Sequence, residues 1–517
     1  MLQLLWFKRD LRLHDHAPLA AAAAAGRVLP VYVHEPELLT TTDHDPRHAA
    51  FVEECLQELR VALAERGAPL LEPHGVLPDV FEALCEQLPI TAIYAHEECG
   101  NGTSYARDRR VRAWARRRGL AMHEFQGSGV VRRLASRDGW HEQWLQHVRA
   151  PRAATPLRIT GATADELSRV PQQFVAPRNA STPPMHVPGM VERQTGGRTH
   201  AERLLGSFLQ ERGEHYRVAM SSPSEAIDAC SRLSPHLTWG TLSVREAYQA
   251  ARGRAAQLRD ELKGLGRTAS NLSQRETLAR WQQSLVSFAS RIEWRDHFIQ
   301  KLESEPALEY RSYAPIFDNV WSLEPDAERL DAWREGRTGY PLVDACMRSV
   351  HATGWLTFRM RAMVMSFASH YLWLHWRPAG LVLARAFTDY EPGIHWMQCQ
   401  MQAGVTGINT IRIYNPIKQA AEHDAAGDFV RRWVPELSAL PTADLLRPWD
   451  APPLMQQMHG MHIGRDYPRP IVPHEASYTH ARDTLHTLKQ AAQQQGVSRR
   501  VWQQHGSRKT PFNASTR

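Results

Sequence analysis

The chain has 517 residues, which at roughly 100–200 residues per domain predicts two to four domains and excludes a single small module. Apolar residues make up 43% and charged residues 23% of the chain, a balance typical of globular rather than disordered proteins. Lys and Arg outnumber Asp and Glu by 62 to 55, and the resulting net charge of +7 is compatible with a polyanionic partner without establishing one.

Apolar runs of strand length alternate with helical segments through roughly the first 130 residues. This alternation predicts a doubly wound parallel sheet, although the GxGxxG fingerprint of dinucleotide binding does not follow the first strand. The apolar runs are LQLLWF (2–7), VLPVYV (28–33), APLLEP (68–73), ITAIYAHE (90–97) and LAMHEF (120–125), and the helical segments are 20–25, 46–66, 77–87 and 103–118.

The second half of the chain has a different pattern. Seven prolines within 151–197 indicate a connection between domains, and from residue 199 to about 440 the periodicity is helical. We therefore predict an α/β domain at 1–135, an interdomain linker at 136–198, an all-α domain at 199–475 and a basic extension at 476–517. The last 20 residues carry five basic residues and no acidic one, and we expect them to be loose.

The six cysteines form no CxxC pair. This spacing disfavours a disulfide scaffold and a metal site built on neighbouring cysteines, so no metal ligands are predicted. Charge arrives at Lys8, too early for a signal peptide, and no run of 18 apolar residues is present. We expect a cytoplasmic protein that does not associate with membranes.

Four segments combine residue types that could carry chemistry. Cys230–Ser243 places small hydroxyls and an arginine ahead of helical sequence, which suits a pyrophosphate, although an ordinary capped turn is the simpler interpretation. The other three segments, 291–298, 355–361 and 389–396, mix charged and aromatic residues, and each alone is compatible with a helix surface.

Taken in this order, the four segments resemble the photolyase/cryptochrome flavoproteins. The similar stretches run from WFKRDLRLHD through SRLSPHLTWG, EWRDHF and FRMRAM to GDFVRRWVPEL, and the resemblance covers about residues 1–475. QMQAGVTGINTIRIYNP resembles a bacterial photolyase-like branch and not the iron–sulfur group. The resemblance implies an N-terminal α/β antenna-type domain and a helical domain that holds FAD beside a DNA-binding cavity.

The resemblance also implies which residues bind FAD. Arg361 and Asp389 match the charged pair beside the flavin ring, and a buried pair avoids an isolated charge. His395 matches the residue that faces flavin N5, where it could titrate near neutrality or be an ordinary core histidine. The remaining cofactor-binding positions are Tyr216, Cys230, Ser231, Arg232, Leu233, Ser234, Arg295, Tyr390 and Glu391.

The resemblance gives the tryptophans a use, and the chain has 16 of them against 14 Phe and 13 Tyr. Trp321 and Trp376 match the outer and middle members of the family's electron-transfer chain. Cys399 stands at the inner position, and Trp396, three residues earlier, is predicted to substitute for the missing tryptophan. Trp373 is a further option.

Five residues match positions of the family's DNA cavity. Trp294 keeps the aromatic platform that stacks a flipped base, and Arg359 keeps a cavity arginine. Arg291, Phe358 and Met401 depart from the cyclobutane-dimer enzymes.

The implied function is a monomeric, blue-light-driven lyase that repairs UV-induced pyrimidine photoproducts in DNA. A cryptochrome-type photoreceptor with a signalling partner is the alternative, and a flavoprotein that binds nucleic acid without photochemistry stays open. A second antenna chromophore, folate or deazaflavin, is undetermined. The arginine-rich helix 106–118 is interpreted as a solvated face in preference to a nucleic-acid patch.

Overall fold

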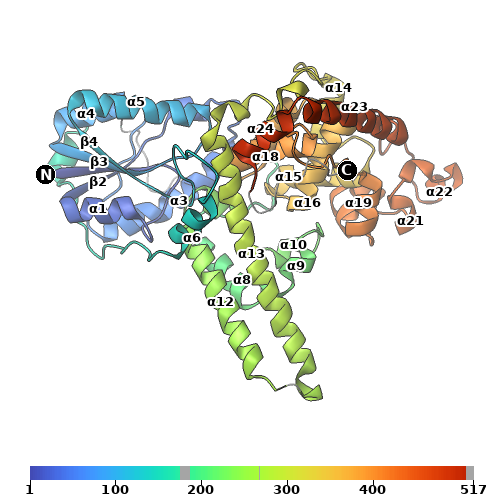
Figure 1. Ribbon diagram of the computed structural model, residues 1–517, viewed down its shortest axis with the longest axis horizontal. Helices are drawn as coiled ribbons and strands as arrows, with labels where there is room; N and C mark the ends of the chain where they lie inside the picture. The colour runs from blue at the N-terminus through green and yellow to red at the C-terminus, as the bar shows by residue number, and fades with distance from the viewer. Residues whose placement is uncertain (175–186, 267, 508–517) are drawn as a thin grey trace.

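The computed structural model describes residues 1–174, 187–266 and 268–507, and it consists of an α/β domain joined to a larger helical domain (Figure 1). Four parallel strands form the sheet in the order β2-β1-β3-β4, which confirms the predicted doubly wound fold. In register, Leu4 lies between Leu29 of β2 and Ile93 of β3. The strands are β1 (Leu2–Phe7), β2 (Arg27–Tyr32), β3 (Ile90–His96) and β4 (Ala121–Phe125).

Helices cover both faces of the sheet, and β1 directs apolar side chains to each of them. Leu4 and Trp6 pack in a cluster with residues of α4 and α5, whereas Leu5 and Phe7 pack with residues of α1 and α3. The expected run at 68–73 adds no strand and makes isolated bridges such as that between Val31 and Leu71. The helices of this domain are α1 (Ala17–Ala25), α2 (Pro36–Leu39), α3 (Pro46–Glu65), α4 (Asp79–Gln87) and α5 (Gly102–Arg118).

From Arg198 onward the described chain forms helices and the loops that join them. Its two longest early helices, α12 and α13, form a hairpin that projects from the body of the molecule (Figure 1). The helices after α5 are α6 (Trp140–Arg149), α7 (Ala164–Ser168), α8 (Arg198–Gln210), α9 (Tyr216–Ala219), α10 (Ala226–Ala229), α11 (Ser234–Thr238), α12 (Val244–Gly264), α13 (Leu272–Ser304), α14 (Ala327–Arg334), α15 (Pro341–Thr353), α16 (Phe358–Ser366), α17 (Trp376–Ala386), α18 (Pro392–Ala403), α19 (Pro416–His423), α20 (Asp428–Trp433), α21 (Thr442–Leu445), α22 (Pro453–Met458), α23 (His474–Gln494) and α24 (Val497–His505).

The segment expected as a linker includes a packed helix. Trp140 and Trp144 of α6 are buried in one core with residues of α8, α12 and α13. The indole N–H of Trp144 donates to Asp296 at 3.0 Å, so α6 is fixed to α13. The proline-rich part of the linker falls partly on residues 175–186, outside the described residues.

The expectation of a loose C-terminus is wrong for residues 498–507. Val497 and Val501 of α24 pack in the main helical core, and the Ser498 hydroxyl donates to the carbonyl of Gly407 at 2.8 Å. His505 contacts Glu305 at 2.8 Å. The valines were missed because basic neighbours dominate the composition of this segment, whereas the helix hides its few apolar residues on one face.

The arginine-rich helix α5 is only partly a solvated face. Arg109, Arg116 and Arg117 are exposed, as expected. Arg107 is fully buried and contacts Glu35 and Glu98, each at 2.5 Å. These ion pairs lie at the carboxyl ends of β2 and β3. The helical periodicity of the sequence did not predict that this arginine is buried.

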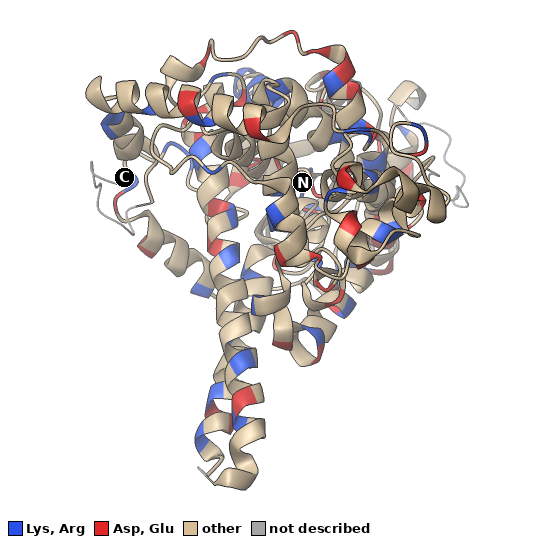
Figure 2. Cartoon of the chain, turned by 90° about the vertical axis from the view of Figure 1, so that its right-hand side faces the viewer, with Lys and Arg blue, Asp and Glu red and all other residues tan. Residues whose placement is uncertain are grey.

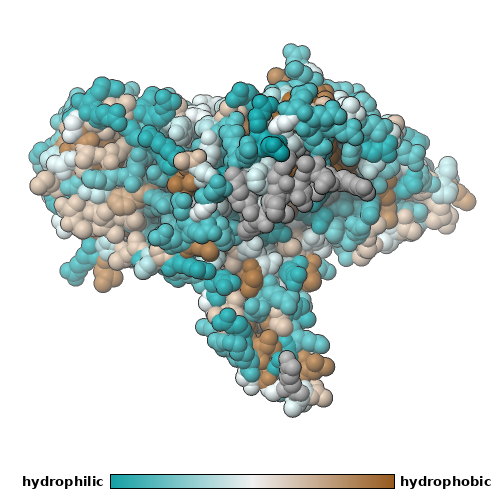
Figure 3. Space-filling view, viewed as in Figure 1, coloured by the Kyte–Doolittle hydropathy of each residue, from teal (hydrophilic) through white to brown (hydrophobic). Residues whose placement is uncertain are grey.

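Hydrophilic residues cover most of the face shown in Figure 3. Among the described residues, no helix has both the length and the apolar character needed to cross a bilayer.

Candidate FAD site and DNA-facing surface

The turn before α11 presents polar groups from a rigid frame. Leu233 is fully buried, whereas Ser231, Arg232 and Ser234 are half-buried. Arg232 adopts a left-handed conformation at φ 59°, a strained geometry for a residue with a side chain. Its carbonyl accepts a hydrogen bond from the Gln194 side chain at 2.7 Å, which holds the turn.

Arg232 carries an incompletely compensated charge. Its guanidinium lies 4.0 Å from the centroid of the Trp355 ring, and it forms no ion pair with an acid of the described chain. Burial lowers the pKa of Arg232 to about 10, because the charged form is poorly solvated there. An anion would relieve this cost, so the arginine and the neighbouring serine hydroxyls fit a pyrophosphate.

Arg361 and Asp389 form a two-pronged ion pair. Nη1 and Nη2 of Arg361 donate to the two carboxylate oxygens at 2.9 and 2.8 Å, and Nε donates to the carbonyl of Leu356. Burial alone would raise the pKa of Asp389, but Arg361 and a hydrogen bond from Ser234 hold it below its ordinary value. The pair is therefore charged at neutral pH, which gives the site a fixed donor next to a fixed acceptor.

The segment that carries Asp389 is held by the α/β domain. Side chains from this domain, together with Trp239 at the C-terminal end of α11, donate hydrogen bonds to backbone carbonyls between residues 386 and 390. A sequence pattern could not reveal this contact because the partners are more than 140 residues apart. The hydrogen bonds are Arg47 to Ala386 (2.7 Å), His48 to Phe387 (2.9 Å), Trp239 to Thr388 (3.0 Å) and Arg9 to Tyr390 (2.9 Å), and the Tyr390 hydroxyl donates to Asp43 (2.7 Å).

Glu391 and Arg295 lie together, though less tightly than the pair above. Arg295 contacts Asp296 at 2.8 Å and Glu391 at 3.5 Å, while Arg9 contacts Glu391 at 3.4 Å. The Oε1 atom of Glu391 is buried without a hydrogen-bond partner in the described chain. The site thus offers an acceptor that a ligand N–H could satisfy, and Arg9 is a member that the sequence did not reveal.

Tyr216 lies at the start of α9 and is buried. Its phenol has a raised pKa, first because of burial, and it accepts a hydrogen bond from Arg291. The carbonyl of Cys230 accepts from Arg212 at 2.6 Å, which places the first residue of the turn.

The expectation that His395 titrates near neutrality is wrong. The ring is buried, its Nε2 atom donates to the carbonyl of Gly380 at 2.8 Å, and Cys399 Sγ lies 3.5 Å from the same nitrogen. Burial lowers the pKa of His395 to about 4. The imidazole is therefore neutral at pH 7, because no carboxylate contacts it to offset the lost hydration.

The tryptophans form a connected row of rings. Trp396 lies 6.0 Å from Trp376, which lies 5.3 Å from His375, all between ring centroids. His375 lies 6.3 Å from Trp321, and Trp321 lies 5.5 Å from Trp373. Trp321 is buried and Trp373 is half-buried, so Trp373 and not Trp321 lies nearer to solvent.

The predicted DNA-cavity residues lie on three helices at the surface. Arg291 is exposed and its guanidinium carbon is 5.7 Å from the centroid of the Phe358 ring, which is 51% exposed. Arg359 and Met401 are half-buried on α16 and α18, and no ring or ion contact joins them to Arg291 among the described residues.

Trp294 lines a cavity of about 390 Å³. Its ring lies 5.1 Å from His297 and 5.8 Å from Phe298. The sequence missed the other walls of this cavity, which come from distant segments and include Arg137, Trp140, Gly506 and Ser507.

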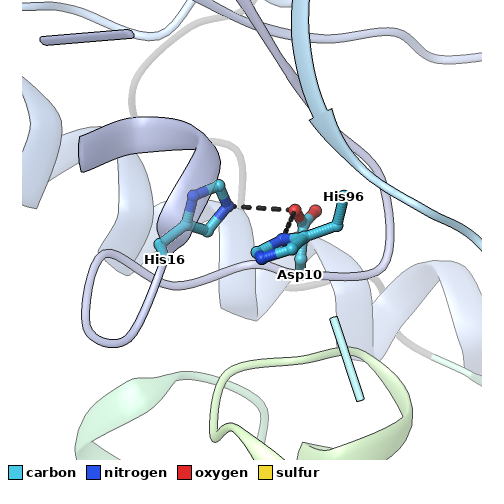
Figure 4. Close-up of side chains that lie close together, drawn as sticks. All are labelled: Asp10, His16 and His96. Atoms are coloured by element: carbon cyan, nitrogen blue, oxygen red, sulfur yellow. Dashed lines mark hydrogen bonds and ion pairs between the residues drawn. The ribbon is translucent and has the colours of Figure 1, made fainter. Parts of the chain in front are cut away.

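Asp10, His16 and His96 meet at the carboxyl ends of β1 and β3 (Figure 4). His16 Nδ1 accepts the backbone N–H of Leu19, so its Nε2 carries the proton and donates to Asp10 at 2.9 Å. His96 Nδ1 contacts the same carboxylate oxygen at 2.7 Å. Since the proton on His16 occupies the position that a metal ligand must leave free, the cluster acts as a hydrogen-bonded clamp.

Comparison with known proteins agrees with this geometry. The family model for DNA photolyase matches residues 3–138, and the model for the FAD binding domain of DNA photolyase matches residues 288–487. The chain is 28% identical over 495 residues to deoxyribodipyrimidine photo-lyase of Escherichia coli, covering 91% of this chain and 96% of that one. It is 26% identical over 491 residues to cryptochrome-1 of Sinapis alba, covering 91% and 93%.

Among solved structures, a bacterial class III photolyase from Agrobacterium tumefaciens is similar with a TM-score of 0.78 at 25% identity, covering 94% of this chain and 98% of that chain. The chain therefore belongs to the photolyase/cryptochrome family of FAD-binding flavoproteins. Relatives of both kinds match to a similar degree, so family membership alone leaves repair and photoreception open.

Proposed function

We propose that the protein is a blue-light-dependent DNA photolyase that repairs UV-induced pyrimidine photoproducts. One observation carries the proposal: on both α13 and α16, predicted DNA-cavity residues lie within four positions of a predicted flavin-site residue. Arg291 and Trp294 precede Arg295 on α13, and Phe358 and Arg359 precede Arg361 on α16. A base that stacks on the outer aromatic side chains would thus lie close to the cofactor.

In this proposal one group of residues binds FAD and another binds the DNA. Arg232, Ser231 and Ser234 would hold the pyrophosphate of FAD, and Arg361 with Asp389 would fix the flavin ring. Bound FAD supplies the light-excited electron that splits the lesion. Trp294 would stack a flipped base, and Arg291 and Arg359 would pair with phosphates.

A repair assay on defined lesions tests the proposal. Purified protein with FAD is incubated with duplexes that carry one cyclobutane dimer or one (6-4) product, in blue light and in darkness. We expect light-dependent loss of one lesion type, and a Trp294→Ala variant should lose most of that activity while it retains FAD. Persistence of both lesions in light would refute the proposal.

A cryptochrome-type photoreceptor is the second candidate, and the C-terminus favours it. Gly506 and Ser507 form part of the wall of the cavity that Trp294 lines, so a light-driven change at this cavity could reach α24. Hydrogen exchange of α24 in light and darkness tests this candidate. Equal exchange rates together with repair activity would exclude it.

A second chromophore, folate or deazaflavin, is part of the proposal as an antenna. Chromatography of the pigments released from purified protein would identify it by its absorbance. Release of FAD alone, after supplementation with both candidates, would remove the antenna from the proposal.

A further inference from the structure

The outer part of the α12–α13 hairpin, beyond about residue 252 of α12, is a long arm that projects from the body of the molecule (Figure 1). Ala251, Ala255 and Leu258 of α12 are buried on the side that packs with α13. Beyond about residue 252 the outer faces are solvent-exposed, and the turn at the tip includes residue 267, which lies outside the described residues.

The arm carries more basic than acidic residues. The described residues 252–266 and 268–283 include six basic and three acidic residues, a net charge of +3. Figure 2 shows basic residues along the arm down to its tip.

Three of these cations form a line on α12. Arg252, Arg259 and Lys263 are 7 and 11 positions apart, and at 100° per residue they fall within about 40° of one helix face. All three are exposed. Asp260 is shared between Arg259 (3.7 Å) and Lys263 (3.3 Å), which leaves the line with a net positive charge.

The arm begins at the surface proposed to receive DNA. α13 runs without interruption from Leu272 at the tip to Arg291 and Trp294. The 19 residues between Leu272 and Arg291 correspond to about 28 Å of helix at 1.5 Å per residue. This length matches about eight base pairs of duplex at 3.4 Å each.

We infer that the arm binds the phosphate backbone of duplex DNA beside the damaged site. The inference rests on the proposed function and adds a partner surface to it. A phosphate backbone fits the arm better than a protein partner does, because Leu272 and Val286 are the only exposed large apolar side chains among the described residues of α12 and α13. We expect the contacts of the arm to be independent of the DNA base sequence, because cations that contact phosphates do not contact the base edges.

The test compares two triple variants with the wild type. Arg252→Gln/Arg259→Gln/Lys263→Gln removes the line on the arm. Arg109→Gln/Arg116→Gln/Arg117→Gln removes the same charge from α5, which lies on the far side of the α/β domain from the arm (Figure 1). Neither set contacts the flavin site, and thermal melts monitored by circular dichroism verify that both variants fold.

Binding to a 30-base-pair duplex with one lesion is measured by fluorescence anisotropy between 50 and 200 mM KCl. We expect the arm variant to bind about tenfold more weakly at the lowest salt, with a log–log salt slope shallower by about 2 to 3. The α5 variant should match the wild type. On a 10-base-pair duplex the arm variant and the wild type should converge, because the arm then has no DNA to reach.

The outcomes separate the two claims. If the wild type binds the duplex and the arm variant has the same affinity and slope, the arm inference is overturned and the proposed function stands. If both triple variants weaken binding equally, bulk charge explains the effect and the arm inference is again overturned. If the wild type does not bind damaged DNA, both claims fall.

Discussion

Asp389 is a buried carboxylate whose charge depends on Arg361. Substitution by Asn keeps the shape of the side chain but leaves Arg361 without its anion. We expect Asp389→Asn to lower the free energy of unfolding by about 3 kcal/mol, measured by urea denaturation. Asp331→Asn, which removes an exposed partner of Arg334, should cost less than about 1 kcal/mol. Equal losses in both variants would contradict a special role for the Asp389 pair.

The same pair sets a pH dependence. The pKa of Asp389 is lower in the folded than in the unfolded chain, so its contribution to stability is complete above the unfolded pKa. This contribution is lost as pH falls through the folded pKa. The difference in unfolding free energy between the wild type and Asp389→Asn should therefore be constant above pH 5 and shrink at more acidic pH.

His395 should make the stability of the protein fall as the solution becomes more acidic. Its folded pKa of about 4 lies below the unfolded value near 6.5, so only the unfolded chain gains a proton between these limits. We expect the stability of the wild type relative to His395→Gln to fall by about 3 kcal/mol between pH 6.5 and pH 4. A difference that is independent of pH in urea titrations would show that the ring is solvated.

At the scale of elements, α17 and α18 place Trp376 and Trp396 in ring contact. On the predicted route, an electron that reduces FAD moves inward from Trp321, past His375, to Trp376 and then to Trp396, so Trp376 lies between the outer and inner rings. We expect Trp376→Phe to slow photoreduction of bound FAD by at least about tenfold, followed by absorbance under blue light. Trp333→Phe is the control, since Trp333 is fully buried and belongs to no ring contact of this row. Unchanged kinetics in Trp376→Phe would remove it from the route.

The helix α24 is fixed by few apolar side chains, so a single charge should release it. Val501→Asp puts a carboxylate into the main core, whereas Gln504→Asp puts the same charge on the exposed face of the same helix. We expect rapid proteolytic cleavage within the segment that follows Gln495 in the first variant alone, with the fragments identified by mass spectrometry. Equal resistance in both would show that α24 is held by other contacts.

Strands and helices with regular hydrophobic spacing could be predicted from the sequence, whereas buried charged residues and contacts between distant segments could not. The strands of the sheet and the helices beyond residue 198 follow from alternation and helical spacing, and the Arg361–Asp389 pair follows from the resemblance to a family. The burial of Arg107 and the packing of α24 could not be predicted from composition, because charged residues are usually exposed and here they lie in or beside buried positions. The anchors from Arg47 and His48 to residues 386 and 387 depend on tertiary contact, which no local pattern encodes.

At the scale of the whole molecule, the α/β domain positions the flavin site from a distance. Arg47 contacts none of the proposed FAD-binding side chains, yet its guanidinium holds the carbonyl of Ala386. Because a hydrogen bond from a charged group contributes about 1.5–3 kcal/mol, we expect Arg47→Ala to weaken FAD binding about tenfold. Equilibrium dialysis measures the change. Arg66→Ala removes a contact within its own helix, to Ala62, and should leave FAD affinity unchanged.

The hydrogen bonds to the backbone carbonyls of residues 386–390 couple the stability of the α/β domain to ligand binding in the helical domain. Free energy released when a ligand orders this segment must also stabilise the side chains of the α/β domain that grip it. Amides near Asp43, Arg47 and His48 should then exchange more slowly when FAD is bound, although the cofactor lies in the other domain. The N-terminal sheet is in this sense an allosteric partner of the flavin, coupled through main-chain oxygens.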